Sequence, residues 1–250
     1  MIHNEEIIHG YKINAEDDEL GKAEAFLFDD ENWTIRYLVA DTRKWLPGRT
    51  VLISPISIKA VNHEEEQVSV SLTKDQVKNS PHIDTDKPVS RQQELELNQF
   101  YGWGNYWGGP GIWGPTMYPP RLLEESYVPR TMETFEDPKK SHLRSTSALQ
   151  DYDIYAKNGN IGHVESFLID DETWRIRYII VDTRNWRPGK KVLIAPAWIS
   201  DVSWGENRVN VAVDKETVEQ APEYDPDAPI SRAYEEKLYS VYGKSPYWEK

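Results

Sequence analysis

The sequence contains no cysteine among its 250 residues. This absence excludes disulfide bonds, thiolate nucleophiles and cysteine metal sites within the chain. Long apolar runs are also missing, and none approaches the roughly 20 residues that a membrane-spanning helix needs. The first residues, MIHNEEIIHG, lack the basic start and the apolar stretch of a secretory signal. We therefore expect a cytoplasmic protein with no transmembrane segment.

Positive charge is scarce. The sequence has 29 Lys and Arg against 42 Asp and Glu, which gives a formal net charge of -13 and a pI near 5.0. Such a chain repels phosphate backbones, so its charge argues against nucleic acid as a partner. Aromatic residues, in contrast, are abundant at 12%, with 10 Trp and 14 Tyr.

The sequence is a duplication. Shifting it against itself by 141 positions aligns it without a gap from Tyr11 to Trp107 of the first copy. The densest block pairs DDENWTIRYLVADTRKWLPG at 29–48 with DDETWRIRYIIVDTRNWRPG at 170–189, and 13 of these 20 positions are identical. Repetition at this length predicts two copies of one fold.

Each copy predicts short strands followed by a helix. In the second copy Asn158-Gly159 is a tight-turn signal, and Trp174, Ile176, Tyr178 and Ile180 alternate as one buried face of a strand. Further short alternating runs follow, so we expect an all-β, mainly antiparallel fold of two small β-barrels. A second repeated block, PVSRQQELELNQFYG and PISRAYEEKLYSVYG, starts near a serine cap and stops at a glycine, which predicts a trailing helix in each copy. Thr73 with Gln76 predicts a capping box on a shorter helix.

The expected organisation has three parts: a first copy at 1–102, a linker at 103–142 and a second copy at 143–250. The linker is rich in Gly, Pro and aromatic residues and then becomes polar, so neither a helix nor a strand can run through it. Its tryptophans are costly to leave in water, and we expect part of it to pack on a domain. They are Trp103, Trp107 and Trp113.

The run DDE-x-W-x-I-R-Y-x-x-x-DTR-x-W-x-PG-x-x-VLI-x-P resembles the PRC-barrel family, over Gly10–Leu72 and Asp151–Val213. That family includes the cytoplasmic domain of the photosynthetic reaction-centre H subunit and the C-terminal domain of the ribosome maturation protein RimM. The resemblance implies a non-catalytic barrel that docks on other macromolecules. The chain closely resembles stand-alone bacterial PRC-barrel proteins, and we expect in it neither the membrane helix of the first relative nor the different N-terminal barrel of the second.

The favoured function is accordingly a non-enzymatic interaction or scaffold protein with an unidentified protein partner. Three alternatives stay open: a regulatory protein that binds a small ligand or metal, a ribosome or RNA-processing factor, and a reaction-centre-associated protein. Catalysis has little support, because the six histidines are scattered and the sequence has no Gly-x-Ser-x-Gly. We expect no cofactor.

Two acidic turns are weak candidates for a cation site, because adjacent carboxylates can bind Ca²⁺ through oxygen. No loop glycine or further ligand spacing supports them, and solvated hairpin turns are the simpler interpretation. The residues are Asp29, Asp30, Glu31, Asp170, Asp171 and Glu172.

The repeated DTR-x-W motif has two interpretations. The motif can fix its own loop, with Asp bound to Arg and Trp lying nearby, or its Arg and Trp can form an interface, where these residue types dominate binding energy. The interface candidates are Asp41, Arg43, Trp45, Asp182, Arg184 and Trp186, together with the linker residues Trp103 and Trp107. We also expect the two barrels to pair within the chain, as two fused copies of a self-pairing domain would.

Overall fold

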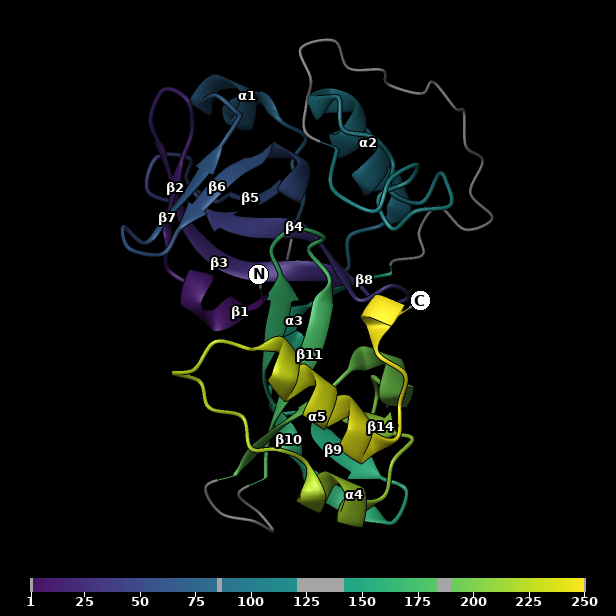
Figure 1. The fold of residues 1–250 in the computed structure, drawn as a ribbon. Helices are drawn as coiled ribbons and strands as arrows, with labels where there is room; N and C mark the ends of the chain where they lie inside the picture. The colour runs from purple at the N-terminus through teal and green to yellow at the C-terminus, as the bar shows by residue number, and fades with distance from the viewer. Residues whose placement is uncertain (1, 85–86, 121–141, 184–189, 250) are drawn as a thin grey trace. The chain divides into compact units, whose positions relative to one another are not determined.

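The computed structural model describes residues 2–84, 87–120, 142–183 and 190–249, and its elements are labelled in Figure 1. The chain divides into two compact units. We call them the first-copy unit, which consists of Ile7–Ser147 and Asp171–Arg175, and the second-copy unit, which consists of Met1–Glu6, Ala148–Asp170 and Ile176–Lys250. The first-copy unit thus contains two short pieces of the second copy, 143–147 and 171–175, and the second-copy unit contains one short piece of the first copy.

The first-copy unit is built on one sheet with the strand order β5-β4-β3-β2-β7-β6. Its strands are β2 (Lys12–Asn14), β3 (Glu19–Asp29), β4 (Thr34–Asp41), β5 (Thr50–Ile53), β6 (Ile58–Asn62) and β7 (Gln67–Val70). Every neighbouring pair is antiparallel except β2 with β7, which is parallel. The short helix η2 (Pro55–Ser57) connects β5 to β6, the two strands at the ends of this order.

The second-copy unit repeats this sheet in the order β12-β11-β10-β9-β14-β13. Its strands are β9 (Asp153–Ala156), β10 (Gly159–Asp170), β11 (Ile176–Asp182), β12 (Lys191–Ile194), β13 (Ile199–Ser203) and β14 (Arg208–Val211). Only β9 with β14 is parallel, and η3 (Pro196–Trp198) connects the two end strands. The predicted all-β, mainly antiparallel fold in two sheet units is therefore confirmed.

The two trailing helices begin at a serine cap and end at a left-handed glycine, as the sequence predicts. The trailing helices are α2 (Arg91–Tyr101) and α5 (Arg232–Tyr242), and the remaining ones are η1 (Glu5–Ile8), α1 (Lys74–Asn79), α3 (Thr146–Leu149), α4 (Lys215–Gln220) and η4 (Tyr247–Glu249). Ser90 accepts a hydrogen bond from the backbone N–H of Gln93, and Gly102 ends α2 in the left-handed conformation with φ 73°. Thr73 and Gln76 form the predicted capping box on α1.

Strand β11 is more buried than its alternating pattern predicts. Ile176 and Tyr178 are buried as expected, but Ile179 and Val181 on the opposite face are fully buried too. The expectation of one buried face was incomplete, because the trailing helix covers the face that carries Tyr178, whose hydroxyl bonds to Glu235 of α5. Burial on both faces makes this strand the centre of its unit.

Each long strand carries an additional strand from the other copy, an arrangement we call the strand exchange. In the second-copy unit β1 (Ile2–Asn4) pairs antiparallel with the end of β10, with Ile2 opposite Asp170. In the first-copy unit β8 (Leu143–Ser145) pairs in the same way with the end of β3, with Leu143 opposite Asp29. Both pairings follow the 141-residue offset of the duplication.

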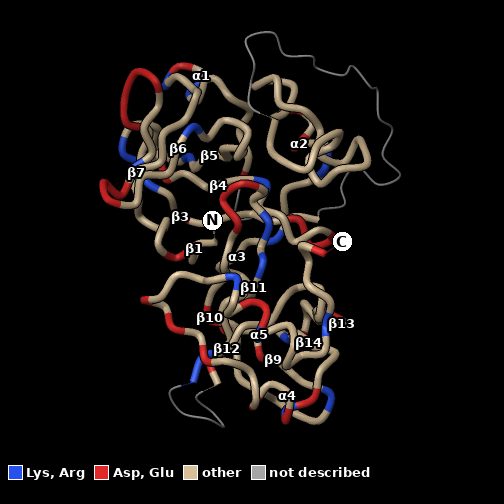
Figure 2. Tube along the Cα trace, viewed as in Figure 1, with Lys and Arg blue, Asp and Glu red and all other residues tan. Residues whose placement is uncertain are grey.

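Of the described residues, no helix is long and apolar enough to cross a membrane. Acidic positions, red in Figure 2, are distributed along both units together with basic positions, which are blue.

Candidate functional site

The DTR-x-W motif of the first copy fixes its own loop. The Asp41 carboxylate accepts hydrogen bonds from the backbone N–H of Arg43 at 3.0 Å and from its Nε at 2.8 Å. These bonds lower the pKa of Asp41 to about 2. Thr42 donates its hydroxyl to the carbonyl of Arg49 across the turn, at 2.9 Å. The motif therefore has the structural role that its spacing suggested.

Trp45 anchors the same loop to the neighbouring strand. Its Nε1 donates to the carbonyl of Leu20 at 2.6 Å, and the Lys74 ammonium lies 4.8 Å from the centre of its ring. The loop also passes very close to Gly21, where a Cβ would lie 1.9 Å from the carbonyl oxygen of Asp41. Gly21 also has φ +140°, which residues with a Cβ rarely adopt. Both the close backbone and this conformation therefore exclude a side chain at position 21.

Arg43 is the member of the motif that reaches solvent. Its side chain is 57% exposed, although its guanidinium is held between Asp41 and Glu24. The loop thus presents a positively charged side chain in a fixed position. The geometry is compatible with the interface interpretation of Arg43.

The second copy repeats the inner part of this loop. Gly162 has φ +131°, and a Cβ on it would lie 2.0 Å from the carbonyl oxygen of Asp182, which is itself buried. Thr183 donates its hydroxyl to the carbonyl of Lys190 at 2.6 Å, as Thr42 does in the first copy. Arg184 and Trp186 lie outside the described residues, so their expected interface role stays a prediction.

The first acidic turn is organised around a buried ion pair. Arg36 Nη2 lies 2.7 Å from Asp29 Oδ2, and both side chains are almost fully buried. Asp29 also accepts the backbone N–H of Glu31 and of Asn32. Burial raises the pKa of Asp29, but Arg36 and the hydrogen bonds from Asn32 outweigh burial, so the pKa lies below its ordinary value. In the second copy Arg177 Nε binds Asp170 at 3.0 Å.

The other carboxylates of the first turn bind basic residues that precede and follow the start of β8. Asp30 lies 3.1 Å from Arg144 Nε, and His142 lies 3.3 Å from Glu31. Burial raises the pKa of Asp30, against the opposite effects of Arg144 and His142. Within the described part of the chain, no three His, Cys, Asp or Glu side chains are grouped to hold a metal ion. In the first turn the carboxylates of Asp29, Asp30 and Glu31 bind arginine or histidine. The cation hypothesis for the acidic turns stays a prediction.

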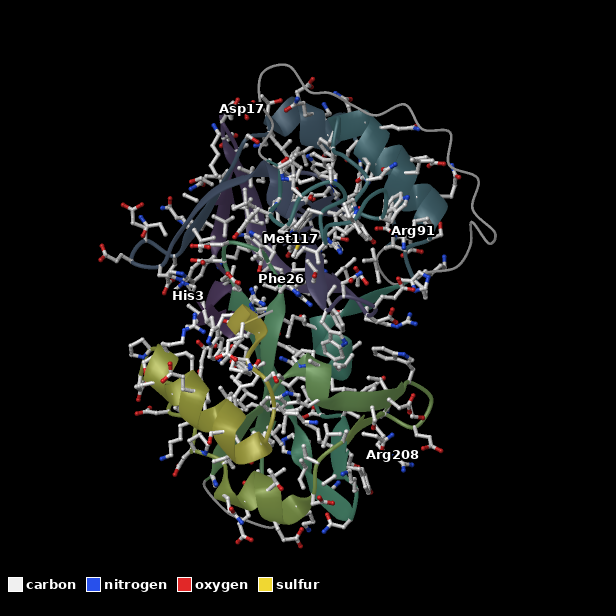
Figure 3. The ribbon with its side chains drawn as sticks, turned by 45° about the vertical axis from the view of Figure 1, so that its right-hand side comes forward. His3, Asp17, Phe26, Arg91, Met117 and Arg208 are labelled. Carbon is white, nitrogen blue, oxygen red and sulfur yellow. The ribbon has the colours of Figure 1, made fainter. Side chains whose placement is uncertain are left out.

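A buried polar cluster, which the sequence analysis missed, joins the trailing helix to the first-copy sheet. Glu94 of α2 is fully buried. Its carboxylate accepts hydrogen bonds from the hydroxyl groups of Tyr37 of β4 at 3.3 Å and of Tyr106 at 2.7 Å. Arg91, labelled in Figure 3, lies 3.2 Å from the same carboxylate. Burial raises the pKa of Glu94 to about 7, because these donors only partly replace water.

The second copy contains the same cluster at equivalent positions. Glu235 of α5 accepts hydrogen bonds from the hydroxyl of Tyr178 at 2.7 Å and from that of Tyr247 at 3.2 Å. Arg232 lies 3.1 Å from the other carboxylate oxygen of Glu235. The sequence does carry a sign of this cluster, because the Arg-x-x-Glu of the trailing helix recurs at the 141-residue offset.

Aromatic residues after each helix stack on the arginines. The Arg36 guanidinium lies 3.8 Å from the ring centre of Tyr106, and that of Arg91 lies 4.2 Å from Trp107. The equivalent pairs in the second copy are Arg177 with Tyr247 at 4.1 Å and Arg232 with Trp248 at 3.8 Å. Cation–π stacking thus folds the Tyr-Trp pair back onto its own unit. Trp107 thus packs on Arg91 of its own unit, and its expected interface role stays a prediction.

The first linker tryptophan lies in the core of the first-copy unit. Trp103 is 1% exposed, donates its Nε1 to the Ser57 hydroxyl at 2.8 Å and stacks on Tyr101 at 4.3 Å. Trp113 likewise donates to the carbonyl of Thr173 within the same unit. For Trp103 the expected interface role is replaced by an internal packing role. The remainder of the linker, 121–141, lies outside the described residues.

A pocket of about 400 Å³ opens beside the motif loop in the first-copy unit. Its wall combines charged side chains, apolar strand residues and two hydroxyls of the segment that includes β8. They include Glu24, Leu27, Arg43, His82, Ser145 and Ser147. This volume lies in the range of small-ligand sites.

Residues 143–218 match the family model of the PRC-barrel domain. The matched stretch begins at β8 and ends in α4. The family model does not extend over the first copy, although the strand order and registers of that copy's sheet repeat those of the second. A search of curated proteins found no significant match. The predicted resemblance is therefore confirmed for 143–218.

Proposed function

We propose that this chain, which carries a PRC-barrel domain at 143–218, is a non-enzymatic scaffold of the bacterial cytoplasm that docks on another protein. A PRC-barrel domain suggests a protein-interaction module, which supports the general class. The buried polar groups point the same way, because Glu94 and Glu235 hold each trailing helix on its sheet. Buried carboxylates that hold a helix on a sheet stabilise a rigid surface.

The observation that carries the proposal is the fixed Arg43. Asp41 holds its guanidinium in place, and Trp45 anchors the loop, so little side-chain freedom is lost when a partner binds. Arginine and tryptophan are the residue types that most often dominate protein interfaces. We assign the docking surface to this loop and, by the repeat, to Arg184 and Trp186 in the second copy.

Two docking loops in one chain provide two binding contacts. We propose that the copies pair within the chain through the strand exchange, since each sheet includes a strand of the other copy. A partner with two matching sites then binds more tightly than either loop alone allows. Duplication is useful to a scaffold for this reason.

The test is a pull-down from bacterial lysate with the full chain, its Arg43→Ala variant and a matched Lys59→Ala variant. Arg43 and Lys59 are 57% and 54% exposed, and each forms a surface ion pair. We expect a defined protein to be lost from Arg43→Ala and retained by Lys59→Ala, with nuclease treatment making no difference. Equal recovery by both variants contradicts the docking loop, and loss on nuclease treatment favours an RNA-processing role.

A second candidate function is the binding of a small ligand in the pocket beside Arg43. Its volume and its mixed charged and apolar wall favour this function. A thermal-shift screen with small anions, sugars, Ca²⁺ and Mg²⁺ tests it. The supporting result is stabilisation that disappears in the His82→Ala variant.

A further inference from the structure

The two exchanged strands are equivalent in every register position. Ile2 lies opposite Asp170 and Leu143 lies opposite Asp29, and the next two pairs in each copy correspond as well. Each strand follows one pattern, an aliphatic residue, a basic or titratable residue and a small polar residue. The two acceptor edges are likewise copies of each other, Leu27–Asp29 and Leu168–Asp170.

Side-chain contacts reinforce this pairing. In the second-copy unit the Ser166 hydroxyl donates to Asn4 Oδ1 at 3.1 Å. In the first-copy unit Asp30 binds Arg144 at 3.1 Å, and its backbone N–H donates to the carbonyl of His142 at 3.0 Å. Each bound strand is therefore held by a polar or charged contact in addition to its backbone hydrogen bonds.

The donor strand and the acceptor edge of one copy lie in different units. The stretch that matches the PRC-barrel family includes β8, yet β8 completes the sheet of the first-copy unit. Because the first strand of each copy pairs in the other unit, the edge of its own long strand is paired only when an equivalent strand from elsewhere binds there. Any second molecule that supplies the same strand in the same register satisfies the same edge.

We propose that the β10 edge at Leu168–Asp170 is an exchangeable strand site, and that its second occupant is β1 of another copy of this chain. The resulting dimer is closed and symmetric, because each chain gives one β1 and receives one. The inference rests on the proposed pairing of the copies within one chain and extends it to pairing between chains.

The short donor strand makes exchange accessible. Strand β1 has three residues, all partly exposed, so it separates from β10 more readily than the buried strands separate from one another. Within one chain the competing β1 is present at an effective concentration on the order of millimolar. Exchange between chains therefore increases as the protein concentration approaches that value.

The absence of cysteine from the sequence permits a direct test with the full chain. A chain with Asn4→Cys is mixed with a chain with Ser166→Cys under mild oxidation. Ser166 is 1% exposed beneath its own β1, so the two introduced thiols meet only when β1 of one chain lies on β10 of the other. The control mixture pairs Asn4→Cys with Asp201→Cys, whose position on β13 is exposed and reports random collision.

We expect disulfide-linked dimers in the Asn4→Cys and Ser166→Cys mixture, several-fold above the control and increasing with protein concentration. A yield equal to the control at every concentration overturns the proposal. The double variant Asn4→Cys/Ser166→Cys separates this failure from failure of the pairing within one chain. If that variant forms its internal disulfide while the mixture does not, exchange is confined to one chain; if neither forms, the strand pairing itself is wrong.

Discussion

Tyr178 Oη lies 2.7 Å from Glu235 Oε1, so a tyrosine at the centre of the second-copy sheet binds a carboxylate of the trailing helix. Tyr37 and Glu94 have the same relationship in the first copy, at 3.3 Å. The duplication has thus retained a buried polar link between sheet and helix in both units. Such a link fixes the position of the helix more sharply than apolar contact alone.

Replacing Tyr178 by Phe tests the contribution of this link. The substitution removes a donor from a buried carboxylate, which costs about 1–3 kcal/mol. We expect the free energy of unfolding to fall by this amount in urea denaturation. Tyr155→Phe is the matched control, because the Tyr155 ring lies against Arg208 at a partly exposed position and its loss of a hydroxyl leaves the cluster intact. Equal effects of the two variants would show that the hydroxyl of Tyr178 contributes little.

Glu94 predicts a stability that depends on pH. Its pKa rises from 4.5 in a free carboxyl to about 7 in the folded protein, so the folded state binds the proton more tightly. The contribution is fully present below about pH 4.5 and is lost as the pH rises through about 7. Since a tenfold change in proton affinity corresponds to about 1.4 kcal/mol, the loss over this range is about 3 kcal/mol.

The measurement is urea denaturation of the wild type and of Glu94→Gln between pH 4.5 and 8. The amide imitates the protonated carboxyl, so we expect the difference in stability to move in favour of Glu94→Gln as the pH rises. Glu96→Gln, an exposed neighbour on α2, serves as the control. A difference between wild type and Glu94→Gln that is independent of pH would contradict a raised pKa.

A charge inside the second-copy core should unfold that unit. Ile176 is 3% exposed on β11. An Asp in its place would put a carboxylate in an apolar environment, which is costly without a compensating partner. We expect Ile176→Asp to lose cooperative unfolding by circular dichroism, whereas Lys237→Asp, on the exposed face of α5, unfolds like the wild type. An unchanged melting curve for Ile176→Asp would mean that this face of β11 tolerates water.

The sequence predicted much of each unit but not the exchange between them. Local patterns determine the alternating strands, the capping box at Thr73 and the glycine at Gly102, because neighbouring residues create these features. The pairing of β1 with β10 depends on residues more than 160 positions apart, and three residues carry too little periodicity to reveal it. The ring stacking of Arg36 on Tyr106 escaped for the same reason, although both residues recur at the duplication offset.

Trp103 illustrates a different limit. As a linker tryptophan it is among the interface candidates predicted from the sequence. It has no tryptophan counterpart in the second copy, where Lys244 stands at the equivalent position. The structure shows a compensating change. Trp198 replaces Ser57, and its ring packs against Tyr242 with the ring centres 4.4 Å apart, while Trp103 stacks on the equivalent tyrosine of the first copy at 4.3 Å.

This compensation predicts strong coupling between positions 57 and 103. Trp103→Lys alone removes a buried aromatic ring and should cost about 3–5 kcal/mol. Ser57→Trp alone adds a ring where Trp103 already fills the space and should cost about 1–3 kcal/mol. The double variant reproduces the arrangement of the second copy, so its loss of stability should be smaller than the sum of the two by at least about 1 kcal/mol.

A double-mutant cycle in urea, followed by circular dichroism, measures this coupling. Trp103→Lys combined with Lys59→Trp provides the control pair, since Lys59 is an exposed residue of β6 that forms its ion pair with Glu16. The control pair should be additive within about 0.5 kcal/mol. Additivity of Ser57→Trp with Trp103→Lys would mean that the two tryptophans do not occupy equivalent space beneath the trailing helix, and that Trp103 stabilises the first copy in a way that the second copy does not share.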